Sequence, residues 1–282
     1  MKVCIAGRND IAADVLDAVA ARLPAADIGI LPSRGDRGAD GWQRSLSAAA
    51  ARHGVREVSL AEAQQARDVV FLSLGFDRIV APSRFRSSRL FNVHFSLLPA
   101  YRGMYPMVWP ILNGETATGV TLHWIDAGID TGDLIAQQRV PIARGDTSRD
   151  LFVACMRAGT ALALTHLDVL LTGTPARTPQ PATGASYYAR ESIDFADIRI
   201  DLTRPAAAVR DQIRAFAFPE YQLPAVHGHR VTGSAILATR SGATPGTILG
   251  DDARTLTIAT RDFDLAIRKA GAVSPDMAGA AQ

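Results

Sequence analysis

Cysteine and lysine are both scarce in this chain of 282 residues, which contains two of each. Cys4 and Cys155 lie far apart in apolar stretches and no Cys-x-x-Cys pair occurs, so we expect buried thiols and neither a disulfide framework nor a thiolate metal site. Arginine therefore carries almost all of the positive charge, and its guanidinium suits bidentate phosphate contacts. A coding bias towards arginine and alanine explains the same composition more simply.

The chain also lacks a strong net charge and a long apolar run. The formal net charge is +2 at pH 7, so bulk electrostatics predict no nucleic-acid partner. No apolar run reaches the roughly 18 residues that a membrane-spanning helix requires. The N-terminal sequence MKVCIAG has neither the apolar core nor the cleavage site of a signal peptide. We therefore expect a cytoplasmic protein with no nucleic-acid partner and no membrane partner.

Strands that alternate with helices predict an α/β fold, with a doubly wound, mostly parallel, Rossmann-like sheet. Segments 2–6 and 27–31 are predicted strands, and the continuous apolar run at 68–74 is typical of a strand covered on both faces. Helices are predicted at 11–22 and 148–171. In such folds ligands bind at the carboxyl ends of the strands.

A change in composition divides the chain into two predicted domains. Residues 172–184 are rich in Thr, Pro and Gly and are the best candidate for a linker. The prediction is a catalytic domain at 1–185 and a second domain at 186–282. The second domain begins with a helix at 206–216, and the short apolar segments that follow predict a small β-rich structure.

The most informative segments are FNVHFSLLPAYRG at 91–103 and HWIDAGIDTGDLI at 123–135. The first is a short strand that delivers Asn92 and His94 to its end, and the second is a strand and turn that present Asp130. An amide can donate to a developing oxyanion, an imidazole can manage protons, and a carboxylate can orient the imidazole. This set suits acyl transfer, and the sequence offers neither a Ser-centred elbow nor clustered metal ligands.

These motifs are similar to those of the 10-formyltetrahydrofolate-dependent formyltransferases, a family that includes glycinamide ribonucleotide, methionyl-tRNA and sugar-nucleotide formyltransferases. The shared signature is Asn-x-His, Ser-Leu-Leu-Pro and Asp-x-Gly, which appears here at 92–94, 96–99 and 130–132. The resemblance is dense from 68 to 142. It implies the formyltransferase fold, with an OB-like C-terminal domain as in some members. It also implies 10-formyltetrahydrofolate as co-substrate and a primary amine as acceptor, with no metal.

The resemblance assigns catalysis to Asn92, His94 and Asp130. Asn92 would donate a hydrogen bond to the formyl oxygen, where negative charge builds, and so would His94 if it is protonated. Asp130 and His94 would share the proton traffic, directly or through water. We expect a structural role for His123 in the second strand, and we expect Ser96 to shape the loop behind His94.

The resemblance also places the folate against two loops. The segment LGFDRIV at 74–80 matches the family's pterin-side loop, where backbone groups recognise the pterin. The second loop is 124–130. Simple core packing would equally explain Ile79 and Val80. The predicted folate-binding residues are Phe76, Arg78, Ile79, Val80, Ile125, Asp126 and Ala127.

The expected acceptor is a nucleotide-linked amino sugar, such as a thymidine-diphosphate 3- or 4-amino-dideoxy hexose. Segments 38–50 and 213–228 look similar to segments of formyltransferases that act on amino-sugar nucleotides. Segment 7–10 lies between a strand and a helix N-terminus, a natural place for an anion, although a simple tight turn is the alternative. Aromatic rings after the 206–216 helix could stack on a base, or they could pack between the two predicted domains. The predicted substrate-binding residues are Arg8, Asn9, Asp10, Tyr105 and Tyr221.

Other functions and assemblies remain open. Methionyl-tRNA formyltransferase usually carries Trp before the Arg-Gly of the loop, where this chain has Tyr at 101. Its C-terminal domain is strongly basic, whereas the charges from residue 229 onward nearly balance. A free amino acid such as ornithine or hydroxyornithine is a second acceptor class, and a non-catalytic folate-binding module is a third alternative. The apolar fraction is compatible with a homodimer but does not require one.

Overall fold

The computed structural model describes residues 1–271, which form two compact units. The first unit comprises residues 1–103, 118–140 and 154–187, and the second comprises 104–117, 141–153 and the chain from 188 onward. The last boundary lies close to the predicted one at 185, but two segments predicted in the catalytic domain group with the second unit. The functional division at 185 stays a prediction. Residues 272–282 of the predicted second domain lie outside the described residues.

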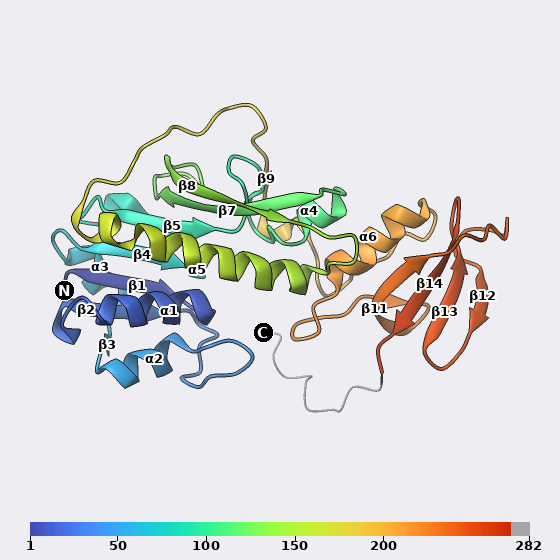
Figure 1. Cartoon of the computed structure of the whole chain (residues 1–282), viewed down its shortest axis with the longest axis horizontal. Coiled ribbons are helices and arrows are strands. Elements are labelled where there is room, and N and C mark those ends of the chain that lie inside the picture. Colours follow the sequence, from blue (N-terminus) through green and yellow to red (C-terminus); the bar gives the residue numbers. More distant parts are fainter. Residues whose placement is uncertain (272–282) are drawn as a thin grey trace. The chain divides into compact units, whose positions relative to one another are not determined.

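A seven-stranded sheet of order β3-β2-β1-β4-β5-β7-β8 forms the centre of the first unit (Figure 1). Its strands are β1 (Val3–Gly7), β2 (Ile28–Pro32), β3 (Arg56–Glu57), β4 (Val70–Leu74), β5 (Leu90–His94), β7 (Ala117–Trp124) and β8 (Leu134–Pro141). Strands β1 to β5 pair in parallel, whereas β7 runs antiparallel to β5. The prediction of a mostly parallel, Rossmann-like α/β sheet is confirmed.

Helices cover both faces of this sheet. They are α1 (Asn9–Ala20), α2 (Leu46–His53), α3 (Leu60–Gln65) and α5 (Ser148–Thr172). Val15 of α1 and Leu167 of α5 line one small apolar space together with Leu72 of β4, so α1 and α5 share a face. Ala63 of α3 belongs to a cluster with Phe71. Because neighbouring strand residues point to opposite faces, α3 covers the other side.

Helix α5 is long and apolar enough to cross a membrane when judged by length and composition alone. It has 25 residues and a mean hydropathy of 1.2 over its most apolar window. The expectation that no such segment exists does not hold by this measure. Half of that window is buried inside the molecule, and Cys155 and Leu167 are fully buried. These are the properties of a core helix.

The second unit contains a five-stranded antiparallel sheet of order β10-β11-β14-β13-β12, packed on α6 (Ala206–Phe216). The strands are β10 (Ala225–Val226), β11 (His229–Ile236), β12 (Ile248–Asp251), β13 (Thr255–Ala259) and β14 (Asp264–Lys269). Val209 and Ile213 of α6 lie on one helix face and join the sheet's core cluster. The predicted helix and β-rich region are confirmed. Among the described strands no pairing joins β10 to β12, so they form an open antiparallel sheet.

Short elements complete the described chain. They are β6 (Arg102–Gly103) paired with β9 (Tyr187–Tyr188), α4 (Trp109–Leu112), and the 3-10 turns η1 (Ala25–Asp27), η2 (Pro82–Arg84) and η3 (Arg190–Ser192).

The pairing of β5 with β7 brings polar side chains together at one end of the first unit's sheet. The antiparallel register sets Asn92 opposite His123 and His94 opposite Thr121. Residues directly opposite each other across two strands lie on the same face of the sheet. This register therefore makes Asn92, His94 and His123 neighbours.

Candidate active site

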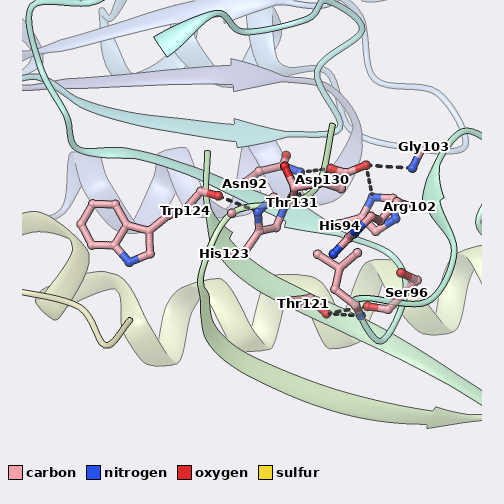
Figure 2. Close-up of polar contacts among 12 residues, drawn as sticks. Asn92, His94, Ser96, Arg102, Gly103, Thr121, His123, Trp124, Asp130 and Thr131 are labelled. Atoms are coloured by element: carbon pink, nitrogen blue, oxygen red, sulfur yellow. Dashed lines mark hydrogen bonds and ion pairs between the residues drawn. The ribbon is translucent and has the colours of Figure 1, made fainter. Parts of the chain in front are cut away.

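Four polar side chains meet beside the carboxyl end of β5 (Figure 2). Asn92 and His94 flank the buried Val93, so they point to the same face of the sheet. His123 comes from β7, and Asp130 comes from the loop that follows it. The structure thus brings together the three residues predicted to be catalytic, and it adds His123 to them.

The carboxylate of Asp130 is the centre of this group. Its Oδ2 accepts a hydrogen bond from the Gly103 N–H at 3.0 Å and lies 3.5 Å from His94 Nδ1. Its Oδ1 accepts from Asn92 Nδ2 at 3.3 Å and lies 3.6 Å from His123 Nε2. Only 13% of the Asp130 side chain is exposed. Protein groups therefore take the place of most of the carboxylate's hydration.

The ionisation of Asp130 follows from two opposing influences. Burial by itself would raise the pKa of this carboxyl group, because the charged form loses hydration. The charge of His94, the hydrogen bond and charge that His123 supplies when its ring is protonated, and the Gly103 N–H all favour the charged form and outweigh burial. They hold the pKa of Asp130 well below its usual range, so the group is a carboxylate at neutral pH.

His94 is placed to carry a proton on either side of its ring. Nε2 lies 2.8 Å from the Tyr101 carbonyl oxygen, which can only accept. Nδ1 faces the Asp130 carboxylate. Both ring nitrogens thus face oxygen acceptors, so each can donate when it carries a hydrogen. The ring suits proton transfer to or from a bound substrate.

His123 is in direct contact with Asn92. Its Nδ1 lies 2.7 Å from the Trp124 carbonyl oxygen, so that nitrogen carries a hydrogen. In the neutral ring Nε2 then accepts from Asn92 Nδ2, 3.0 Å away, a tautomer assigned from the contacts. The second Nδ2 hydrogen is directed to Asp130. Asn92 must release one of these bonds before it can donate to a substrate oxygen.

Ser96 holds the loop that follows β5. Its Oγ donates to the Ala100 carbonyl oxygen at 2.6 Å, and its own carbonyl oxygen accepts from Thr121 Oγ1 at 2.6 Å. Thr121 also accepts from the Leu98 N–H at 3.1 Å. These contacts agree with the expected loop-shaping role of Ser96.

The predicted folate-binding loops lie close together. Phe76, Val80 and Ile125 all pack on the buried cluster that contains Phe71 and Leu90. Val80 therefore takes part in core packing, the alternative considered for it. The prediction that it binds folate remains untested.

The remaining predicted folate residues are more exposed or locally bonded. Ile79 is 80% exposed, so core packing does not explain it. The Arg78 guanidinium lies over the Phe76 ring, 4.7 Å from its centroid. Asp126 accepts from Thr131 Oγ1 at 2.6 Å and shapes its own loop, and Ala127 is exposed.

The predicted substrate residues fall into two groups. Arg8, Asn9 and Asp10 lie together at the start of α1, where Asn9 has a left-handed backbone with φ of 67°. The Asp10 carboxylate accepts from the Arg44 N–H at 2.7 Å, so it serves an internal contact.

Tyr105 and Tyr221 belong to the second unit. The Tyr105 ring meets Phe195 edge-on with centroids 4.8 Å apart, and Tyr221 is 39% exposed beside Phe218. Both rings keep aromatic neighbours within their own unit. Their role in binding stays a prediction.

Gly132 makes the turn after Asp130 possible, because a Cβ at this position would overlap the Trp124 carbonyl oxygen. We expect Gly132→Ala to lower the free energy of unfolding by about 1–3 kcal/mol, as overpacking does, and to displace Asp130. Urea unfolding and kcat measure the two effects. Gly41→Ala is the matched control, since a Cβ added there would meet no atom within 4 Å beyond its chain neighbours. Equal stability of the two variants would contradict this expectation.

Comparison with known proteins finds two family matches and several solved relatives. The family model described as "Formyl transferase" matches residues 47–165, and "Formyl transferase, C-terminal domain" matches 192–277. An N-formyltransferase from Helicobacter canadensis, solved with folinic acid and dTDP-3-aminofucose, is 34% identical with a TM-score of 0.89. It covers 96% of this chain and 100% of its own. WlaRD, described as a sugar 3N-formyl transferase with dTDP and 5-N-formyl-THF, is 33% identical with a TM-score of 0.89 and covers 97% and 99%.

Curated relatives match a shorter part of the chain. A methionyl-tRNA formyltransferase from Synechococcus sp. (strain JA-3-3Ab) is 38% identical over 150 residues, which is 52% of this chain and 46% of that protein. One from Bordetella petrii is 41% identical over 125 residues, or 44% of this chain and 38% of that protein. The match therefore spans less than half the length of these curated relatives.

Proposed function

Because the chain belongs to the formyl transferase family, as its motifs predicted, we propose that it transfers a formyl group from 10-formyltetrahydrofolate to the primary amine of a nucleotide-linked amino sugar. The main support for this proposal is the contact of Asn92 and His94 with the largely buried carboxylate of Asp130. Two relatives that match nearly the whole chain support it, since one was solved with folinic acid and a dTDP-amino sugar and the other with dTDP and a formyl folate.

Three of the chain's side chains divide the chemistry of this reaction. The acceptor amine forms a C–N bond to the formyl carbon while the bond from that carbon to the folate nitrogen breaks. Asn92 donates one Nδ2 hydrogen to the formyl oxygen, where negative charge builds. Asp130, a carboxylate with a lowered pKa, and His94 take the proton from the amine and return one to the folate nitrogen.

Asn92 can donate an Nδ2 hydrogen to the formyl oxygen only after one of its existing hydrogen bonds is broken. Its two Nδ2 hydrogens are directed to His123 Nε2 and Asp130 Oδ1. The bond to Asp130 is the longer of the two, at 3.3 Å against 3.0 Å. We infer that the formyl oxygen takes this hydrogen, while His123 keeps the amide oriented.

The remaining contacts to the two substrates follow the sequence predictions. Arg8 and Asn9 bind the acceptor's phosphates beside the α1 N-terminus, and Asp10 orders that turn through its bond to Arg44. Tyr105 and Tyr221 offer rings to the sugar and the base. The folate lies against the two loops formed by Phe76, Arg78, Ile79, Val80, Ile125, Asp126 and Ala127.

The first test of the acceptor is thermal stabilisation by nucleotides in the presence of 5-formyltetrahydrofolate, an unreactive mimic of the co-substrate. We expect thymidine diphosphate to raise the Tm more than uridine or guanosine diphosphate does. Binding at a ligand concentration 100-fold above Kd stabilises the native state by about 2.7 kcal/mol, which is a shift of several degrees. A shift with folate alone, and none with any nucleotide, would contradict the sugar-nucleotide proposal.

A pair of arginine variants assigns the phosphate contact. Arg8→Gln should lose most of the shift caused by thymidine diphosphate and keep the shift caused by the folate. Arg37→Gln is the matched control, because Arg37 is exposed on the neighbouring loop. Identical nucleotide shifts in the two variants would remove Arg8 from the site.

Methionyl-tRNA formylation is the second candidate, since two curated relatives carry that name over about half of this chain. Binding to tRNA phosphates would weaken steeply with salt. A tRNA mobility-shift assay at two salt concentrations decides between the candidates. A free amino acid acceptor remains if both the nucleotides and tRNA fail.

A further inference from the structure

The segment from Thr174 to Tyr187, called here the strap, overlaps the predicted linker at 172–184 but is tied to the rest of the first unit at several points. Thr178 exchanges two backbone hydrogen bonds with Leu134, at 2.8 and 3.0 Å. The Ser186 carbonyl oxygen accepts from the backbone N–H of Arg102 at 2.9 Å. Between these anchors the strap contacts the loop that carries Asp130 and the loop at 101–103.

Gln180, in the middle of the strap, joins those two loops through its side-chain amide. Its Nε2 donates to the carbonyl oxygens of Asp130 at 2.9 Å and Gly132 at 2.8 Å. Its Oε1 accepts from the Arg102 guanidinium, 3.1 Å from Nε and 2.6 Å from Nη2. Both amide hydrogens and the amide oxygen are used. Replacement of either end of the amide therefore breaks the link.

The backbone at both loops needs such a restraint. Asp130 has a φ of 54° and Tyr101 a φ of 60°, values that residues other than glycine adopt only when their surroundings fix them. Each of these residues supplies a group to the site: the carboxylate of Asp130, and the Tyr101 carbonyl oxygen that accepts from His94 Nε2 at 2.8 Å. Ser186 Oγ further accepts from the Tyr101 N–H at 2.8 Å.

We propose that Gln180 is a positioning residue for formyl transfer: its amide fixes the Asp130 loop to the 101–103 loop, so that the Gly103 N–H and the His94 ring meet the Asp130 carboxylate in one geometry. The expected fall in kcat rests on the proposed function. The fixed geometry of the two loops rests on the hydrogen bonds alone. Gln180 touches no reacting atom and acts through Asp130 and Arg102. A misplacement of about 1 Å at reacting groups can cost about 10²-fold in rate.

The substitution Gln180→Glu separates positioning from general stability. Glutamate has nearly the same shape and still accepts from Arg102, but it replaces the donor with an oxygen that faces the Asp130 and Gly132 carbonyl oxygens. We expect kcat to fall by about 10²-fold, with little change in Tm, in KM or in the Kd for 5-formyltetrahydrofolate. Gln138→Glu is the matched control, because Gln138 is exposed on β8, and it should leave kcat at the wild-type value.

Two further measurements are specific to a shared contact. The losses caused by Gln180→Ala and Arg102→Ala should not add in the double variant, since both act through one contact. Hydrogen exchange at the Gly103 amide, which donates to Asp130, should be faster in Gln180→Glu than in the wild type or in Gln138→Glu.

The exchange readout does not depend on the choice of acceptor. Faster exchange at Gly103 in Gln180→Glu would support the role of Gln180 whatever the acceptor is. If the wild type formylates no amino-sugar nucleotide, that second result would overturn the proposed acceptor and not the role of Gln180. Unchanged exchange and an unchanged kcat in Gln180→Glu would overturn the inference. So would equal falls in Tm, folate affinity and kcat, because those would indicate a purely structural residue.

Discussion

Asp130→Asn is expected to lower kcat by about 10²–10⁴-fold, the contribution of general acid–base catalysis by a positioned side chain. Asparagine fills nearly the same space, but it cannot take a proton from the acceptor amine and it offers the His94 ring no negative charge. The Kd for 5-formyltetrahydrofolate should change little, because Asp130 is not among the predicted folate-binding residues and its carboxylate contacts Gly103, Asn92 and His94. Steady-state kinetics with thermal-shift binding measure both quantities.

The control for this variant is Asp168→Asn, which neutralises an exposed carboxylate on α5 that pairs with Arg22. It should leave kcat unchanged. Retention of wild-type activity in Asp130→Asn would remove Asp130 from the proton traffic. Of the three proposed catalytic residues, only Asn92 and His94 would then remain.

The same variant should change how stability depends on pH. The folded-state pKa of Asp130 is lowered, whereas an unperturbed aspartate titrates near about 3.9. Its contribution to stability is therefore fully present above about pH 4 and is lost as pH falls towards the folded-state pKa. The difference in unfolding free energy between wild type and Asp130→Asn should shrink as the pH falls below about 4. Urea unfolding at several pH values measures it, and a constant difference would contradict the assignment.

Asn92→Ala is expected to lower kcat by about 10²–10³-fold, the usual cost of one lost oxyanion donor. The donor acts mainly where charge has developed, so the loss should appear in kcat and not in folate affinity. The change also leaves His123 Nε2 without its amide partner. Gln138→Ala is the control for loss of an exposed amide. Equal losses of kcat and of folate binding would indicate that Asn92 orders the site and does not stabilise the transition state.

Local patterns in the sequence predicted much of the site. The alternation of Asn92, Val93 and His94 on a short apolar strand predicts that the two polar residues share a face. The turn residues around Gly128 and Gly132 place Asp130 after the second strand. The continuous apolar run at 68–74 correctly predicted β4, which is buried along its whole length.

Long-range contacts account for what the sequence did not predict. His123 joins the site only because β7 pairs antiparallel with β5 in one register, and no local pattern fixes that pairing. Gln180 lies in a stretch whose Thr, Pro and Gly content is typical of a linker, but its hydrogen bonds to Asp130, Gly132 and Arg102 depend on residues far away in sequence.

The pairing of β5 with β7 also limits which changes an evolving formyltransferase can tolerate. A slip of one residue in either strand would turn His123 to the opposite face and bring Leu122 or Trp124 opposite Asn92. An insertion or deletion of one residue inside either strand is therefore disfavoured by parity, whatever residue it adds, unless a bulge absorbs it. The first part of the connecting segment, residues 95–103, is held by its own contacts to the site. The turn at 113–116 lies just before β7, at the end of that strand away from His123, so descendants of this chain should vary in length there while the strand pair passes on unchanged.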